Sequence, residues 1–464
     1  MTASMIRRFL QASQATRKRC NSVRHESKPA IFGNTLIIGA GPAGIHAAVS
    51  WSRVSNRIGL LNREGEHARQ VRKLLADADF HVQCDVLVSG KEQLSGSAKI
   101  HRYYEGYQEL DPDWDTVLLC TPSDHYGRIL GEWPGEMRRK VKQLILLSPG
   151  IGSNALVQSL LGEHAQRIEV VSLSTYYAAS KFMNARAPLT SVVKGIKRKI
   201  RLASGRRERS VCIAVSELIQ TLGVQCEIVD TPLEAESHSI TTYVHPPLFM
   251  NTFSLNEIFS LSKSSKYMYK LYPEGPITPH VMRSMVHLWK EVSRVLQKLE
   301  IQPVNLLKFL NDDNYPVHEQ SISRAQIEEF PSMDAVMQEY LLYVRYSSLL
   351  IDPFSAPDEQ GRYYDFSAVP YRQVVLDRDG CWQIPRVPHE DYYKLKVLCE
   401  VAIRLEVPMP QARSLIEQYR NKLFSFLASE GTGRYHPDFI EDHAEEQAAA
   451  VLKTTHRNVQ IAGE

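Results

Sequence analysis

One short run near the N-terminus restricts the possible folds more than any other feature of the chain. It reads Leu36-Ile37-Ile38-Gly39-Ala40-Gly41-Pro42-Ala43-Gly44, an apolar stretch followed by the spacing G-x-G-x-x-G. In a dinucleotide-binding βαβ unit, Gly39 permits a tight turn, Gly41 lets the backbone approach a pyrophosphate, and Gly44 allows close packing of helix on strand. The N-terminus of the helix adds N–H groups for the phosphates. The cofactor-binding residues expected in this loop are Gly39, Gly41, Pro42, Ala43 and Gly44.

Strands and helices alternate from this loop to about residue 185. We expect the first strand at Asn34–Ile38, the first helix at Pro42–Val54, and a second helix that contains Val71 and Leu75. Further strands are expected at Ile58–Leu61, Val86–Leu87, Val117–Cys120, Leu144–Leu147 and Val170–Leu173. This alternation predicts an α/β protein whose N-terminal domain is a Rossmann-type, doubly wound parallel sheet.

Beyond residue 185 the pattern changes, first to basic strands and then to helices. The segment Lys194–Arg209 holds eight Lys or Arg residues and one acid. The apolar residues between them predict exposed strand faces and a hairpin with Gly205 in its turn, with nucleic-acid binding as the alternative. Helices are expected from Pro279 onward and at Met333–Leu350, Asp391–Leu405 and Pro410–Ala428. The expected organisation is a basic disordered tail (1–30), a Rossmann domain (31–185), a mainly helical substrate-binding domain (186–430) and a flexible C-terminal tail (431–464).

Composition excludes several classes of function. The 464 residues carry a formal net charge of only +3, which does not favour a nucleic-acid or membrane partner. The seven cysteines are scattered without a C-x-x-C pair, so we expect a reducing compartment rather than a zinc cage or a disulfide framework. No apolar run is long enough for a transmembrane helix. Residues 1–30 are basic, which fits a disordered tail or a transit peptide. We therefore expect a cytoplasmic protein.

The residues after the second strand decide which dinucleotide fits. An NAD site usually has Asp or Glu there for the ribose 2′-hydroxyl, whereas this chain has Asn62-Arg63. A guanidinium can hold a 2′-phosphate, so we expect Arg63, together with Arg69, to bind NADPH or NADP+. Glu64 is the competing residue, because it takes the ribose role if the strand runs longer. FAD is the competing cofactor, and a yellow preparation would support it.

The run Thr241–Asn251 contains the candidate acid–base residue. His245 precedes two prolines, and a following proline restricts its backbone. Imidazole titrates near neutrality, which suits the proton transfer that accompanies a hydride transfer. Tyr243 is the candidate for a hydrogen bond to the substrate. The alternative for both residues is a purely structural role in the core.

Acids and cations elsewhere in the chain complete the candidate site. Asp312 and Asp313 lie in a loop before a proline, and either can orient a catalytic histidine; a turn or helix cap is the alternative. Asp352 is a rival carboxylate. Lys270, in a rigid turn, and Arg345, on a helical stretch, are candidates for binding a substrate carboxylate. A solvated surface lysine is the alternative for Lys270.

Together these stretches resemble the opine metallophore dehydrogenases, the enzymes that complete staphylopine, pseudopaline and yersinopine. The resemblance runs from about residue 33 to about residue 430. It is carried by Ser174–Tyr177, Tyr243–Asn251, Tyr269–Thr278, Asn314–Val317, Glu339–Arg345, Ile351–Ser355 and Asp365–Pro370. It implies that NADPH reduces the imine formed between an α-keto acid, pyruvate or 2-oxoglutarate, and the amine of a histidine-aminobutyrate (nicotianamine-like) intermediate. The product of such enzymes is exported to chelate metal.

The resemblance also implies roles for single residues and for partners. His245 is the general acid–base, Tyr243 hydrogen-bonds the substrate, and Asp313 is the first choice for the carboxylate beside the histidine, although its spacing differs from related enzymes. Ala179 stands where staphylopine-type members have an acid, which favours an L-histidine-derived substrate. A nicotianamine-synthase-like enzyme acts upstream. The enzyme itself is expected to be a homodimer that needs no metal.

Two other functions stay open at this point. A flavin-dependent oxidoreductase would be coloured as purified. A non-catalytic NADP-sensing protein on a Rossmann scaffold would bind NADPH without turnover, and His245 would be dispensable. The keto acid and the metal that the product carries also stay open.

Overall fold

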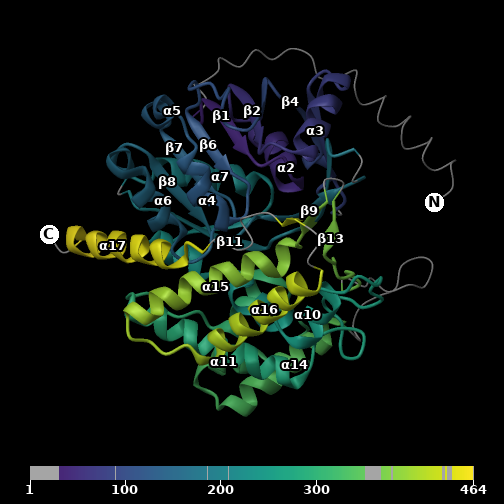
Figure 1. The fold of residues 1–464 in the computed structure, drawn as a ribbon. Coiled ribbons are helices and arrows are strands. Elements are labelled where there is room, and N and C mark those ends of the chain that lie inside the picture. The colour runs from purple at the N-terminus through teal and green to yellow at the C-terminus, as the bar shows by residue number, and fades with distance from the viewer. Residues whose placement is uncertain are drawn as a thin grey trace.

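The computed structural model describes residues 31–88, 90–184, 187–206, 208–350, 367–377, 380–430, 434–435 and 442–462. Its upper half in Figure 1 is built on a sheet, and its lower half is a bundle of helices. No helix within these ranges is both long and apolar enough to cross a membrane.

The central sheet has eight strands in the order β12-β11-β8-β7-β6-β1-β2-β5. Their bounds are β1 Asn34–Ile38, β2 Arg57–Asn62, β5 Arg102–Glu105, β6 Thr116–Leu119, β7 Gln143–Leu146, β8 Glu169–Leu173, β11 Lys199–Ser204 and β12 Gln225–Ile228. Neighbouring strands run parallel except β8 and β11. The central strands are buried along almost their whole length, as parallel strands covered on both faces must be. The predicted doubly wound sheet is confirmed.

Helices cover both faces of this sheet. One face packs on α2 (Pro42–Trp51), α3 (Glu66–Asp77) and α7 (Ser210–Thr221), which share a core with its strands. The other face packs on α4 (Tyr126–Gly131), α5 (Gly135–Lys140) and α6 (Ser153–Leu161), which share a second core. The carboxyl ends of the six mutually parallel strands, β5, β2, β1, β6, β7 and β8, meet at one edge of the sheet, where a nucleotide site is expected.

The basic segment after residue 185 forms strands, but it does not form the predicted hairpin. β10 (Thr190–Ile196) pairs with β3 (His81–Val86) and β9 (Ala178–Phe182) in a second sheet, of order β4-β3-β10-β9, in which β4 is Gly96–Lys99. β11 instead extends the central sheet, because Ile200 and Leu202 are buried in its core. The chain crosses between the sheets at 197–198, and Gly205 lies in a bend after β11. The central sheet thus continues to Ile228, past the boundary expected at residue 185.

The remainder of the chain builds a helical domain around one large core. Its main helices are α9 (Ile240–Phe249), α10 (Thr252–Ile258), α11 (Pro279–Lys298), α14 (Ala335–Leu350), α15 (Arg386–Arg404) and α16 (Pro410–Ser429). α11 begins where the Thr278 hydroxyl accepts a hydrogen bond from the Val281 N–H, which satisfies one of the free donors of the first turn. The predicted helical stripe, which includes Met282, Met285 and Val292, faces the core. A small sheet, β13 (Val375–Leu376), β14 (Cys381–Gln383) and β15 (Arg434–Tyr435), reaches back toward the Rossmann domain (Figure 1).

The C-terminal segment differs from the flexible tail that the sequence predicts. Residues Ala444–Ala462 form α17, which packs against α6 of the sheet domain and α15 of the helical domain. Ala448 and Val451 are buried, and a side chain at Gly152 would collide with Val451. Figure 1 shows α17 along the seam between the two halves. The buried face of this helix is formed by only a few apolar residues, which include Ala444, Ala448 and Val451.

Candidate active site

The glycine loop has the geometry expected of a nucleotide site. Gly39 has a φ of +110° and donates from its backbone N–H to the Leu61 carbonyl at 2.8 Å. A Cβ on Gly44 would lie 1.8 Å from the Gly39 carbonyl oxygen, so only glycine permits this contact between helix and strand. A Cβ on Gly41 would meet nothing within 4 Å, because Gly41 faces open space. Pro42 opens α2 immediately afterwards, at a position where its missing N–H costs nothing.

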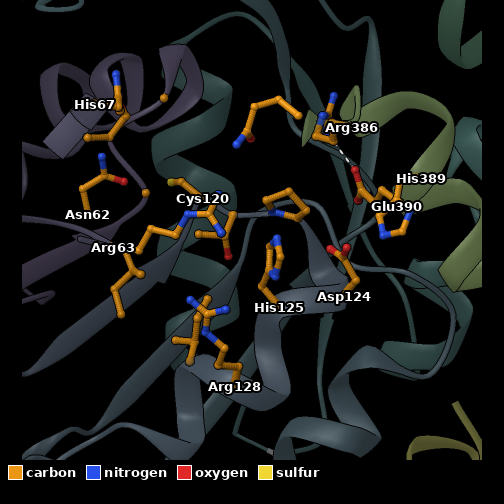
Figure 2. Close-up of a pocket in the computed structure, with 18 of the residues that line it drawn as sticks. Asn62, Arg63, His67, Cys120, Asp124, His125, Arg128, Arg386, His389 and Glu390 are labelled. Carbon is orange, nitrogen blue, oxygen red and sulfur yellow. Dashed lines mark hydrogen bonds and ion pairs between the residues drawn. The ribbon is translucent and has the colours of Figure 1, made fainter. Parts of the chain in front are cut away.

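A cavity of about 380 Å³ lies over this loop, between the sheet domain and α15. Figure 2 shows Asn62 and His67 at one end of the cavity and Asp124, His389 and Glu390 at the other. The cavity is lined from the sheet domain by the ends of β1, β2 and β6, and from the helical domain by β14 and the start of α15. A cleft between domains, at the carboxyl ends of parallel strands, is the usual place for a dinucleotide.

The end of the cavity at β2 is basic. Arg63, His67 and Arg128 line it together with Asn62. A second, adjoining hollow is lined by the same residues and by four acids, Glu64, Glu66, Glu132 and Asp377. Arg63 has an exposed side chain, which suits it to meet a phosphate. Arg69 is exposed on α3 and is not among the lining residues of either hollow, so its part in binding stays a prediction. The sequence analysis missed His67, whose signal is its place in the first turn of the helix that follows β2.

His245 forms the best-defined pair of titratable groups. It lies on α9, and its Nδ1 is 3.1 Å from Oδ2 and 3.2 Å from Oδ1 of Asp391 on α15. Asp391 is buried, whereas the His245 side chain keeps 15% of its exposure. The ring of Phe249 packs edge-on against the imidazole at 5.1 Å between centroids. A buried carboxylate on Nδ1 holds the proton there and leaves Nε2 for proton exchange.

This pairing corrects the predicted partner of His245. Asp313 forms an ion pair with Arg201 of β11, and Asp312 accepts hydrogen bonds from Arg324. Both lie in or beside a π-helical turn, Phe309–Asn314, that packs against the sheet domain. Asp352 lies outside the described residues. Because Asp391 is separated from His245 by 146 residues, no local pattern in the sequence links them.

Two of the predicted substrate contacts are instead part of the core. Tyr243 is fully buried and donates its hydroxyl hydrogen to the Ser237 carbonyl at 2.9 Å. Arg345 is also buried, and its guanidinium donates to the carbonyls of Leu310 and Tyr315 at 2.7 and 3.0 Å. Both side chains therefore fix the backbone of the helical domain, and neither reaches the cavity.

The other two predicted substrate residues lie near the surface. Ala179 is exposed on β9, opposite Gly195 of β10. Tyr176, just before this strand, has its hydroxyl 2.6 Å from His46 Nδ1 on α2, and it donates to Ser180 Oγ at 3.1 Å. This link fixes β9 to the helix that follows the glycine loop. Lys270 is half-buried in a turn, and its own backbone carbonyl accepts a hydrogen bond from the Ile277 N–H.

The start of α15 carries a dense charge network that the sequence analysis missed. Glu390 accepts from Lys394 at 2.6 Å and from Arg386 at 2.9 Å. Burial alone would raise the pKa of Glu390, but Lys394 and Arg386 outweigh it and lower the pKa to about 2. Burial, together with the charge of Glu390, raises the pKa of the neighbouring Asp124. The signal in the sequence is the run Arg386-Val387-Pro388-His389-Glu390-Asp391, unusually rich in titratable residues for the start of a buried helix.

Comparisons with known proteins agree on one family. A family model described as staphylopine dehydrogenase matches residues 33–455. The chain is 41% identical over 426 residues to the pseudopaline synthase of Pseudomonas aeruginosa strain UCBPP-PA14, which covers 91% of this chain and 97% of that protein. It is 36% identical over 388 residues to the staphylopine synthase of Staphylococcus aureus strain Mu50, covering 83% and 89%. A solved yersinopine dehydrogenase with NADP+ bound is similar with a TM-score of 0.84 at 34% identity, covering 91% of this chain and 99% of that one.

Proposed function

This chain belongs to the staphylopine dehydrogenase family, and on that premise we propose that it catalyses the last step in the synthesis of an opine metallophore. An α-keto acid, pyruvate or 2-oxoglutarate, condenses with the amine of a histidine-aminobutyrate intermediate, and NADPH reduces the imine to a secondary amine. The protein is thus an oxidoreductase that acts on a CH–NH group.

The His245–Asp391 pair is the observation that carries this proposal. It lies beside the nucleotide cavity, because Asp391 directly follows Glu390 on α15, and Glu390 lines that cavity. Water must leave the carbinolamine, and the nitrogen of the product must be protonated, so the reaction needs a group that both gives and takes a proton. With Nδ1 held by Asp391, Nε2 of His245 serves both steps. Bound NADPH supplies the hydride.

The basic end of the cavity supports NADPH rather than NADH as the reductant. Arg63 and His67 line the cavity where the 2′-phosphate of a cofactor on the glycine loop would lie. The charge and hydrogen-bond donors of a guanidinium match a phosphate, whereas NADH offers only a hydroxyl there. Four acids, Glu64, Glu66, Glu132 and Asp377, share the adjoining hollow, and in this proposal their carboxylates stay outside the phosphate contact.

The wider context of the reaction follows from the same premise. A nicotianamine-synthase-like enzyme supplies the amine, both act in the cytoplasm, and the enzyme is a homodimer. The exposed face of α14 supports the dimer, because Val336, Met337 and Tyr340 keep 76%, 40% and 59% of their exposure. A helix that is apolar on its outer as well as its inner face fits an interface better than a solvated surface.

The first experiment follows NADPH absorbance with the histidine-aminobutyrate intermediate and either pyruvate or 2-oxoglutarate. Oxidation that requires both substrates supports the opine reaction, and the faster keto acid identifies the product. A His245→Gln variant should fold and bind NADPH, but its kcat should fall by about 100-fold or more, which is the usual contribution of a general acid–base. Protein that binds NADPH and oxidises it with neither keto acid would exclude this function and leave only the nucleotide site.

A further inference from the structure

The reacting complex contains oxyanions that need a cation near the catalytic pair. The keto acid carries a carboxylate, and the cofactor carries a pyrophosphate. Arg345, which the sequence singled out for a carboxylate, is buried on backbone carbonyls and is not available. Its role has to fall to a cation that faces the cavity.

Arg386 faces the cavity from the helical domain. It is the first residue of α15, and its side chain keeps 62% of its exposure while it lines the hollow over the glycine loop. Figure 2 shows its guanidinium at the rim, joined to Glu390 by one interaction. That bond runs from one terminal nitrogen of the guanidinium to Glu390 Oε2. Within the described residues most of its N–H groups therefore remain for a ligand.

Glu390 is shared between two cations, because it pairs with Lys394 as well as with Arg386. Its Oε1 lies 2.6 Å from Lys394 Nζ, and both side chains are more buried than that of Arg386. Two cations thus share one ionised carboxylate, and Arg386 is the one that is exposed to the cavity. Asp391 and Asp124 also act on its charge, and its exposed guanidinium can still bind an anion in the cavity.

Arg386 is also close to the catalytic pair. The charge of Asp391 contributes to raising the pKa of Arg386, after the larger effect of Glu390. Tyr269 lies within electrostatic range of both Arg386 and Asp391, and its ring packs on Phe249, which in turn packs on His245. Arg386 therefore lines the nucleotide cavity from the same end of α15 that carries Asp391, the partner of His245.

We propose that Arg386 binds an oxyanion of the reacting complex across the interdomain cavity, either the carboxylate of the α-keto acid or the pyrophosphate of the cofactor. The identification of the carboxylate rests on the proposed function; the pyrophosphate requires only the nucleotide site. Because α15 carries both Arg386 and Asp391, an anion bound to Arg386 also holds this helix in place when the cavity is occupied.

Arg386→Gln removes the charge and leaves Glu390 with Lys394, so the fold should hold. We expect an increase of about 10- to 100-fold in one binding constant, the range for a charge-assisted hydrogen bond. An increase in the KM of the keto acid with an unchanged Kd for NADPH identifies the carboxylate. An increase in the Kd for NADPH, measured by the fluorescence of the bound cofactor, identifies the pyrophosphate. Arg386→Lys should recover part of the loss in either case.

Arg283→Gln is the matched control. Arg283 has a similarly exposed side chain, at 58%, and pairs with Glu339 away from the cavity, so its loss should change neither constant. If Arg386→Gln also changes neither the KM nor the Kd, Arg386 binds no oxyanion of this complex and the proposal is wrong. Wild-type protein without opine turnover would instead refute the proposed function, and the NADPH and keto-acid binding constants, measured by calorimetry, would still test Arg386.

Discussion

At the scale of single residues, the site consists of groups whose partners lie far away in the chain. His245 on α9 is held by Asp391 on α15, and both oxygens of Asp391 lie within 3.2 Å of the imidazole Nδ1. Asp313, the acid that the sequence favoured, instead neutralises Arg201 between the two domains. In our proposal the two carboxylates therefore have different tasks, Asp391 in proton transfer and Asp313 in holding the domains together.

The pairing predicts opposite phenotypes for two conservative substitutions. Asp391→Asn keeps the shape of the side chain but removes the charge that fixes the histidine tautomer, so kcat should fall about 100-fold or more while the Kd for NADPH stays unchanged. Asp313→Asn is the control, and it should lower the melting temperature more than kcat. A full loss of turnover in Asp313→Asn with normal turnover in Asp391→Asn would reverse our assignment. Steady-state kinetics measures kcat for both variants, and thermal unfolding measures their melting temperatures.

Cofactor preference belongs to the same scale. Arg63→Ser should raise the KM for NADPH about 10- to 100-fold, because it removes a charge-assisted contact to the 2′-phosphate, and should leave the KM for NADH nearly unchanged. The ratio of kcat/KM for the two cofactors measures the effect. Arg72→Ser is a suitable control, since Arg72 on α3 pairs with Glu105 outside the cavity. Equal losses for NADPH and NADH would show that Arg63 does not read the phosphate.

At the scale of secondary-structure elements, α2 connects the glycine loop to the second sheet. His46 is buried on this helix, with its Nδ1 2.6 Å from the Tyr176 hydroxyl. Burial, together with the nearby charge of Arg53, lowers the pKa of His46 from 6.5 to about 4. His238, which follows α8 (Pro232–Ser237), has its pKa lowered to about 4 as well, mainly by burial. Both imidazoles are therefore neutral in the folded protein at pH 7.

This predicts a loss of stability in mild acid. Because the folded-state pKa of His46 is below the unfolded value, the unfolded chain binds the proton more tightly. The stabilisation is complete above pH 6.5 and is lost as the pH falls toward 4. The loss should be about 1–3 kcal/mol per histidine. His46→Gln should be less stable than wild type at pH 7 but lose less stability between pH 7 and pH 5, in chemical unfolding. Parallel stability curves for the two proteins would contradict this.

At the scale of the whole molecule, the nucleotide cavity exists because two domains meet. The sheet domain provides the glycine loop and the basic end, and the helical domain provides Arg386 and Glu390, with the His245–Asp391 pair on α9 and α15 behind them. α17 crosses the seam and packs on α6 and α15. A further hollow of about 400 Å³ under α17 shares Asp124 and His389 with the nucleotide cavity, so this helix forms an outer wall of the active-site region.

The seam predicts that α17 contributes to global stability. Val451→Asp places a carboxylate against Gly152 in a buried contact and should destabilise the fold by about 2–4 kcal/mol. Lys453→Asp, on the exposed side of the same helix, should have little effect. Thermal unfolding with and without NADPH separates the two variants. If Val451→Asp unfolds at the wild-type temperature, α17 is not a structural part of the seam.

The sequence by itself determined the sheet domain and the nucleotide loop. Local features are sufficient there, because strand periodicity and the G-x-G-x-x-G spacing act over a few neighbouring residues. The structure confirms the strand at Asn34–Ile38, and it starts the helix at Pro42 as predicted. Arg63 also follows from order alone, since the residue after the second strand must lie near the ribose of a cofactor on this loop. His245 was proposed from its setting before two prolines, and its catalytic role stays a prediction.

Only the tertiary structure decided which groups surround His245. Tyr243 and Arg345 looked like ligand-binding residues, yet each is drawn into the core to satisfy backbone carbonyls, which no periodicity reveals. The charged run from Arg386 to Asp391 was not singled out in the sequence. Glu390 forms its ion pairs within α15, but Asp391 depends on His245 of α9 and Arg386 on the cavity. The pairing of His245 with Asp391, 146 residues away, depends on how α9 and α15 pack in the folded chain, and no local sequence pattern predicts it.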